Sequence, residues 1–279
     1  MRNSDQADRP GARKTGDTAI ASAKWKPAVL LVAALVLVPI GGLIVLGGVL
    51  AGFATAPRAA SEEPPTPRER GPHDATSRHP FNEVKKWVRV FDDPARDEWQ
   101  RPADVAAALH LEPGMTVADL GSGTGYFIEH LSRPVSPGGM VLAIDTEPEM
   151  VKYIGARATR GGLGNVVPVL AQPDDPYLPL GRVDRVLIVD TYHHIDNRLG
   201  YFGTMRKALT SSGRIAIVDF KKKPLPVGPP PEHKLTRGFV IEEMETAGWT
   251  LDREETFLPF QYFLIFRPAG SPAAKAGGR

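Results

Sequence analysis

The chain has 279 residues, with 34 basic and 32 acidic side chains, and it contains no cysteine. The lack of cysteine excludes disulfides, a cysteine nucleophile and cysteine-ligated metal centres. A formal net charge of +2 is too small for a nucleic-acid footprint, so no nucleic-acid partner is expected. The 28 glycines and 27 prolines are numerous for one compact domain, so part of them must lie outside it.

Residues 28–53 form an apolar stretch without a charged side chain. A helix of this length, at about 1.5 Å per residue, is about 39 Å long and exceeds the roughly 30 Å hydrocarbon core of a bilayer. The stretch therefore predicts one tilted transmembrane helix behind a basic N-terminal tail, residues 1–27. A cleaved signal peptide is the alternative, because small residues follow at 54–56. Signal peptides usually have apolar regions of about 7 to 15 residues, which favours the retained anchor.

The charges beside this stretch predict its orientation. Six basic residues precede it and three follow within twenty residues, which favours a cytoplasmic N-terminus and an extracytoplasmic C-terminal part. Residues 54–79 are rich in proline and predict a semi-rigid linker. Residues 80–268 have the length of one ordinary domain, and residues 269–279 read as a disordered tail.

Short apolar runs alternate with helical patterns along the predicted domain. In chain order, we expect a helix at 103–111, a strand at 116–120, a helix at 126–134, strands at 140–145 and 166–170 around a helix at 147–159, a strand at 186–190, a helix at 199–210, a strand at 214–219, a helix at 238–247, and strands at 250–258 and 261–267. Near-continuous apolar strands are typical of a parallel sheet covered on both faces. The fold class is therefore α/β, a doubly wound, mostly parallel seven-stranded sheet. The last two strands are joined too closely for a helical crossover and predict a terminal antiparallel hairpin.

A glycine-rich turn follows the first predicted strand. Gly121, Gly123 and Gly125 occupy alternate positions after Asp119, and a helical pattern begins at once. Glycines at this spacing allow a tight turn and a close approach of the backbone to a ligand. The second strand ends in Asp145, whose carboxylate can accept hydrogen bonds from both hydroxyls of a ribose. Since ligands of doubly wound sheets bind at the carboxyl ends of strands, the pattern predicts a nucleoside-bearing ligand.

The spacing separates two kinds of nucleoside site. A dinucleotide fold has Gly-x-Gly-x-x-Gly, whereas here the third glycine comes one residue earlier and Asp119 precedes the turn. Asp119, the three glycines and Asp145, with this succession of strands, resemble the class I S-adenosylmethionine-dependent methyltransferases, in particular their small-molecule, type 11-like branch. The likeness covers about residues 103–268.

The resemblance implies a cofactor, S-adenosyl-L-methionine, and roles for individual residues. The turn from Gly121 through Ser122 and Gly123 to Gly125 would approach the methionine part, Asp119 would help to hold its amino group, and Asp145 would bind the ribose. An acid after the third strand often lies near the adenine. Here Asp174 or Asp175 could serve, although a turn built from proline and aspartate is an equally good reading of that segment.

Two histidines follow the fourth predicted strand, where the methyl acceptor would lie. His193 or His194 could accept a proton from the acceptor, because histidine titrates near neutral pH. A hydrogen bond that fixes the loop is the competing interpretation of each, and it is somewhat favoured.

Three other segments allow two readings. Lys221–Lys223 is interpreted as a solvated loop edge rather than a phosphate site, although it could meet anionic headgroups. Residues 228–233 could line the acceptor pocket. The segment with Arg96, Trp99, Gln100 and Arg101 could close over the cofactor or form a packed flap.

The predicted function is a membrane-anchored methyltransferase with a small or lipid-like acceptor. A tethered S-adenosylmethionine-binding module without turnover is the main alternative, and a nicotinamide oxidoreductase is a weaker one. The predicted topology is at odds with this function, because it places the domain outside the cytosol, where the cofactor is expected.

Overall fold

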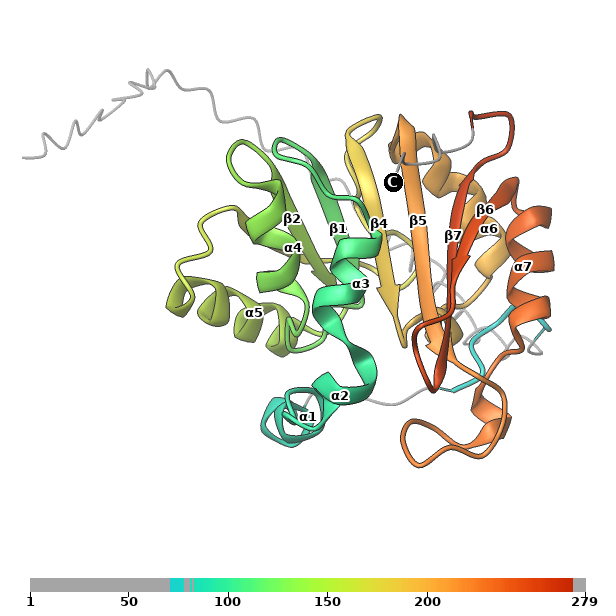
Figure 1. Ribbon diagram of the computed structural model, residues 1–279, viewed down its shortest axis with the longest axis horizontal. Helices are drawn as coiled ribbons and strands as arrows, with labels where there is room; N and C mark the ends of the chain where they lie inside the picture. The colour runs from blue at the N-terminus through green and yellow to red at the C-terminus, as the bar shows by residue number, and fades with distance from the viewer. Residues whose placement is uncertain (1–70, 78–80, 82, 273–279) are drawn as a thin grey trace, which may run out of the picture. The chain divides into compact units, whose positions relative to one another are not determined.

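The computed structural model describes residues 71–77, 81 and 83–272, which all belong to one compact unit (Figure 1). Within these residues, no helix combines the length and apolar character needed to cross a bilayer. The predicted transmembrane helix at 28–53 lies outside the described residues, as do the N-terminal tail, most of the linker and the end of the C-terminal tail. These assignments therefore remain predictions.

A seven-stranded sheet forms the centre of the described unit (Figure 1). Its strands are β1 (Thr116–Leu120), β2 (Met140–Asp145), β3 (Val166–Leu170), β4 (Val183–Val189), β5 (Leu209–Phe220), β6 (Trp249–Glu255) and β7 (Gln261–Pro268). The order across the sheet is β3-β2-β1-β4-β5-β7-β6. Neighbouring strands from β3 to β5 are parallel, and β7 is antiparallel to both β5 and β6. The predicted parallel sheet with a terminal antiparallel hairpin is confirmed.

Helices cover both faces of the sheet (Figure 1). They are α1 (Val84–Phe91), α2 (Arg96–Gln100), α3 (Pro102–Ala108), α4 (Ile128–Val135), α5 (Pro148–Arg160), α6 (Arg198–Met205) and α7 (Arg237–Thr246), with the short 3-10 helices η1 (Tyr192–His194), η2 (Arg206–Ala208) and η3 (Pro231–His233). Apolar side chains of α3, α4 and α5 pack on one face, and those of α6 and α7 pack on the other. The strand order reverses direction at β1, which lies between β2 and β4, and ligands of doubly wound sheets bind at the carboxyl ends of the strands at such a point.

The structure differs from the prediction at several element ends. β4 begins at Val183 and ends at Val189, one residue before the predicted end, because Asp190 turns out of the strand with φ +52°. β5 begins five residues earlier than predicted, since Val183 pairs with Leu209 although the residues after Leu209 are polar. α1 and α2 were not predicted as helices. Both are short, α2 is mostly polar, and α1 buries none of its side chains fully.

Residues 72–77, called here the N-terminal strap, bind to the loop after β4 and to α6. Arg198 donates hydrogen bonds from Nη1 to the carbonyl of Asp74, at 2.7 Å, and from Nη2 to that of Pro72, at 2.9 Å. The amide of Thr76 donates to the carbonyl of His193 at 2.9 Å. The contacts of the domain therefore begin before residue 80, within the segment that composition predicts to be linker.

Candidate functional site

The glycine turn between β1 and α4 has the backbone that its sequence requires. Gly121, Gly123 and Gly125 have φ values of +74°, +57° and +77°, in the left-handed region that favours glycine. A Cβ on Gly121 would lie 2.3 Å from the Thr191 side chain. The turn therefore packs directly against the loop after β4. This contact joins the end of β1 to the segment that carries His193 and His194.

Asp119 is the penultimate residue of β1 and precedes this turn, with 3% of its surface exposed. Its Oδ2 accepts a hydrogen bond of 2.6 Å from Ser122 Oγ. Burial raises the pKa of Asp119 to about 6, and the nearby charge of Asp145 adds to the rise although the Ser122 bond opposes it. The carboxylate is thus costly to ionise as it stands, and a cation placed beside it would relieve that cost.

Asp145 ends β2 on the other side of the turn. Its Oδ2 accepts a hydrogen bond from the Gly123 amide at 2.8 Å, and its Oδ1 accepts one from the Glu147 amide at 3.0 Å. Burial raises its pKa, although these backbone hydrogen bonds lower it. Each carboxylate oxygen keeps a second lone pair, so Asp145 can still accept bonds from two hydroxyls. The structure brings Asp119, the glycines and Asp145 together as the sequence predicts.

Helices α1 and α2 lie against the same turn. Asp92, just after α1, accepts hydrogen bonds from Thr124 Oγ1 at 2.7 Å and from Arg157 Nη1 at 2.8 Å. The Arg96 guanidinium stacks on the Tyr126 ring, 4.2 Å from its centroid, and its Nη2 lies 3.7 Å from Asp190 Oδ2. Of the two readings of this segment, the structure therefore shows packing beside the glycine turn.

His193 lies in η1, just past the end of β4, and is 2% exposed. Its Nδ1 is 2.8 Å from Oδ2 of Asp219, which lies near the end of β5 and is fully buried. Burial lowers the pKa of His193, but the charge and the hydrogen bond of Asp219 outweigh it, and the net change is upward. Since Nδ1 donates to Asp219, Nε2 is the ring atom that can accept a proton.

Asp190, just after β4, interacts both with Arg96 beside the glycine turn and with the charges of Asp219 and His193. Its Oδ1 accepts a hydrogen bond of 2.7 Å from Gln261 Nε2, and Gln261 Oε1 accepts one of 2.9 Å from Gln100. Burial raises the pKa of Asp190 to about 7, and the charge of Asp219 adds to the rise. The φ of Asp190 is also positive, which is uncommon for a residue other than glycine and costs energy. Such backbone strain is found most often at functional positions.

Two predicted site residues occupy more peripheral positions. His194 Nδ1 lies 3.0 Å from the carbonyl of Ser77, so this ring fixes the N-terminal strap to the loop. Asp174 is exposed in the turn after β3, where the Asp175 carboxylate accepts a hydrogen bond from the Tyr177 amide. The start of this turn is bonded to the end of β2, through Ala171 N and Asp145 O at 2.9 Å. The assignment of Asp174 to adenine remains a prediction.

Sequence reasoning assigned no role to Asp190, Asp219 or Gln261. A signal for the two acids was present, because Asp190 and Asp219 end their predicted strands as Asp119 and Asp145 do. Gln261 gave no signal, since its place beside Asp190 depends on how β7 pairs with β5.

The fold and the glycine turn between two acids define a Rossmann-like domain of the methyltransferase type, and comparisons with known proteins agree. The family described as "Methyltransferase domain" matches residues 111–250, about half of the chain. A crystal structure of an S-adenosylmethionine-dependent methyltransferase from Aquifex aeolicus has 30% sequence identity, with a TM-score of 0.63. It covers 68% of this chain and 98% of its own.

Curated relatives extend the comparison. A ubiquinone/menaquinone biosynthesis C-methyltransferase of Shewanella pealeana is 29% identical over 127 residues, which are 45% of this chain and 47% of the relative. A nocamycin O-methyltransferase of Saccharothrix syringae is 38% identical over 74 residues, 26% of each chain. The chain thus spans half or less of the length of these relatives. It belongs to the methyltransferase-domain family, in the class I, type 11-like branch of the S-adenosylmethionine-dependent methyltransferases.

The residues of the site fit the cofactor of this family, S-adenosyl-L-methionine. Asp119 offers a buried carboxylate to a cationic amino group, and Asp145 offers two acceptor oxygens to ribose hydroxyls. Gly123 adds backbone without a side chain, and an added Cβ there would meet the Phe91 ring at 3.5 Å. The turn therefore contacts the end of α1 on one side and the ends of β1 and β2 on the other.

Proposed function

We propose that the protein transfers a methyl group from S-adenosyl-L-methionine to a small or lipid-like acceptor held at the ends of β4 and β5. One observation carries this proposal, the hydrogen bond between His193 and Asp219. His193 is two residues beyond Thr191, which packs against Gly121 of the cofactor turn. A base in this position would be buried, held in orientation by Asp219 and close in the chain to the turn that we propose binds the cofactor.

When bound, the cofactor would supply a methyl carbon on a sulfonium. An acceptor nucleophile would attack this carbon in line with the carbon–sulfur bond, which breaks as the sulfur leaves as a neutral thioether with the bonding electron pair. The residues of this chain position the acceptor and take up its proton. His193 Nε2 accepts the proton that the acceptor loses, and Asp219 stabilises the resulting imidazolium while it holds the ring by Nδ1. The names of two relatives, for ubiquinone/menaquinone biosynthesis and for nocamycin, support a small-molecule acceptor.

The proposal includes a membrane anchor at residues 28–53, supported by the length of that uncharged stretch. The excess of basic residues before it supports a cytoplasmic N-terminus and an extracytoplasmic domain. A reporter fused after Arg279 tests this topology. Activity of the reporter on the cytoplasmic side would contradict the charge bias and would place the domain where the cofactor is made.

The activity itself is tested with methyl-labelled S-adenosylmethionine. The full chain is incubated with the labelled cofactor and with a lipid or aqueous extract, and we expect label in an extract component. The His193→Ala variant should bind the cofactor in calorimetry but transfer little label. Cofactor binding by the wild type without transfer to any extract would instead identify a non-catalytic binding module.

A further inference from the structure

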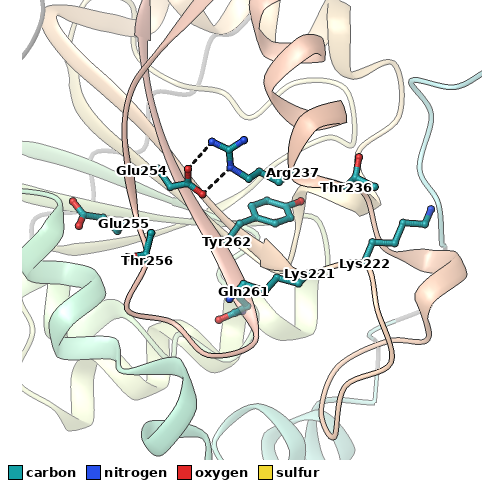
Figure 2. Close-up of a pocket in the computed structure, with 9 residues that line it drawn as sticks. All are labelled: Lys221, Lys222, Thr236, Arg237, Glu254, Glu255, Thr256, Gln261 and Tyr262. Atoms are coloured by element: carbon teal, nitrogen blue, oxygen red, sulfur yellow. Dashed lines mark hydrogen bonds and ion pairs between the residues drawn. The ribbon is translucent and has the colours of Figure 1, made fainter.

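A cavity of about 390 Å³ opens beside the ends of β5 and β6, at the start of α7 (Figure 2). We call it the α7 cavity. Its lining residues come from four segments and are Lys221, Lys222, Thr236, Arg237, Glu254, Glu255, Thr256, Gln261 and Tyr262. It is distinct from the glycine turn, which lies across the sheet at β1 and β2.

The start of α7 makes this cavity favourable for an anion. Thr236 is the N-cap residue of this ten-residue helix, and its Oγ1 accepts a hydrogen bond from the Phe239 amide at 3.2 Å. The first amides of a helix have no acceptor within the helix and carry partial positive charge. Gly238 stands in this first turn, and a Cβ placed on it would meet no atom within 4 Å. No side chain therefore covers the backbone on the side to which this Cβ would point.

The charged side chains of the cavity leave a positive balance. Glu254 is engaged by Arg237, whose Nε and Nη2 donate to its two oxygens at 2.7 and 2.5 Å. Glu255 is paired with Arg253 at 2.9 Å. The ammonium of Lys221 rests on the carbonyls of Leu258 and Pro259, which carry no formal charge.

Lys222 adds a second cation whose charge is not neutralised. It is exposed at the rim of the cavity, and no ion pair to it occurs within the described part of the chain. Lys221, Lys222 and the start of α7 therefore line a space whose two carboxylates are already paired.

A second and independent observation points to a ligand. Tyr262 is 3% exposed, and its hydroxyl has no hydrogen-bond partner among the described residues. Figure 2 shows this hydroxyl directed toward Thr236, across the cavity from the paired Glu254. A buried hydroxyl without a hydrogen-bond partner is unfavourable for the folded state, so its presence here calls for an explanation. An oxyanion that enters the cavity would provide the missing acceptor.

The cavity adjoins the proposed centre of methyl transfer. Tyr262 pairs across the sheet with Asp219, which holds His193. Gln261, the preceding residue, binds Asp190 and also lines the cavity. A molecule with its anionic group in the α7 cavity would therefore extend its other end toward the ends of β4 and β5.

We propose that the α7 cavity binds an anionic group, carboxylate or phosphate, of the methyl acceptor. Lys222 and the first turn of α7 attract the anion, and the Tyr262 hydroxyl donates a hydrogen bond to it. That the anion belongs to the methyl acceptor rests on the proposed function. That the cavity binds an anion does not.

The test uses inorganic phosphate and benzoate as probes of the full chain. Melting temperature is measured over increasing probe concentration at constant ionic strength, and the dissociation constant follows from the shift. Three variants are compared with the wild type. Lys222→Glu reverses a lining charge, Lys223→Glu makes the same change on the neighbouring exposed residue outside the cavity, and Tyr262→Phe removes only the hydroxyl.

We expect at least one probe to protect the wild type. Lys222→Glu should weaken that probe about tenfold or more, because charge-assisted contacts are the strong ones. Lys223→Glu should change it by less than about twofold, since Lys223 does not line the cavity and solvent and salt screen its charge there. Tyr262→Phe should weaken it severalfold without lowering the melting temperature in the absence of probe. Preference for phosphate or for benzoate identifies the anionic group.

Three results would overturn the inference: no protection by either probe, equal loss in the two lysine variants, or unchanged affinity in Tyr262→Phe. Cofactor binding is measured in parallel by calorimetry, and Lys222→Glu should leave it unchanged. If the protein does not bind the cofactor and does not transfer label but still binds the probes, the proposed function is refuted and the anion site stands.

Discussion

The two halves of the site are built in different ways. The cofactor half, from Asp119 to Asp145, comes from two adjacent strands and the turn between β1 and α4, and backbone amides and open glycines form most of it. The acceptor half is assembled from side chains of the loop after β4, of β5 and of β7, and from the N-terminal strap. A continuous segment with a fixed backbone suits a ligand common to a family, whereas a convergence of side chains can change with the acceptor.

The largest effect should come from the acceptor half. His193→Ala removes the proposed base, and general base catalysis contributes about a hundredfold to ten-thousandfold in rate. We expect kcat for label transfer to fall by that factor at neutral pH. The dissociation constant of S-adenosylmethionine, measured by calorimetry, should change little because the cofactor half is untouched.

Two further variants sharpen this prediction. Asp219→Asn removes the charge that raises the pKa of His193, so the rise of activity with pH should move to lower pH. His194→Ala should cost far less, because Nδ1 of that ring is bound to the Ser77 carbonyl. Full turnover in His193→Ala would mean that the acceptor reacts without a base from this residue.

The next largest effect should come from the contact between the halves. Gly121→Ala places a Cβ within 2.3 Å of Thr191 at a φ of +74°. Overpacking costs about 1 to 3 kcal/mol, and a left-handed residue with a side chain about 1 to 2 more. Urea denaturation should show a loss of about 3 to 4 kcal/mol in the free energy of unfolding, with cofactor binding weakened more than tenfold.

Gly162→Ala is the matched control for backbone strain. Gly162 has a φ of +63°, but a Cβ there would meet no atom within 4 Å. The Gly162→Ala variant should therefore lose only about 1 to 2 kcal/mol in the free energy of unfolding and should bind the cofactor normally. Adding Thr191→Gly to Gly121→Ala should recover part of the lost stability. No recovery would show that strain in the turn, rather than contact with the loop, dominates.

The same contrast explains what the sequence could predict. Asp119, the glycines and Asp145 lie at strand ends within one continuous stretch, so periodicity and spacing were sufficient to place them. The pairing of His193 with Asp219 depends on the register of β4 against β5, and Gln261 reaches Asp190 from an antiparallel strand. Register and side-chain direction are properties of the assembled sheet, and a single sequence does not specify them.

The N-terminal strap escaped prediction for a related reason. Its composition is that of a linker, but His73 Nδ1 lies 2.7 Å from Glu243 Oε1, and Glu243 also binds Arg198 at 2.8 Å and Tyr192 at 2.6 Å. Polar residues of a proline-rich segment give no periodic signal in the sequence. Their contacts with the domain became visible only through Glu243, the buried acid of α7 that binds His73.

Glu243→Gln should be the third largest change. It leaves Arg198, which is fully buried, without its carboxylate, and breaking a buried ion pair costs about 3 to 5 kcal/mol. Because the amide still accepts one hydrogen bond, we expect the lower figure, about 3 kcal/mol, in urea denaturation. Glu242→Gln on the exposed side of α7 is the control and should change stability by less than about 0.5 kcal/mol. Equal effects would show that the network around Glu243 contributes no more than a surface charge.

The smallest effect concerns the pH dependence of the cofactor half. The folded pKa of Asp119, about 6, exceeds its ordinary value of 3.8, so ionisation makes the folded state less stable as pH rises between these values. A bound ammonium reverses this preference, because it favours the carboxylate. Affinity for S-adenosylmethionine should therefore decline below about pH 6, by at most about tenfold per pH unit.

Asp119→Asn and a shortened ligand isolate the cause of that decline. The asparagine variant should bind the cofactor more weakly at pH 7.5 and without the pH dependence, and its free energy of unfolding at that pH should not be lower, since a costly buried charge has been removed. Methylthioadenosine lacks the amino group, so calorimetry between pH 5 and pH 7.5 should give a constant affinity for it. If its affinity declines in parallel with that of the cofactor, the titrating group is at the ribose end, where Asp145 also has a raised pKa.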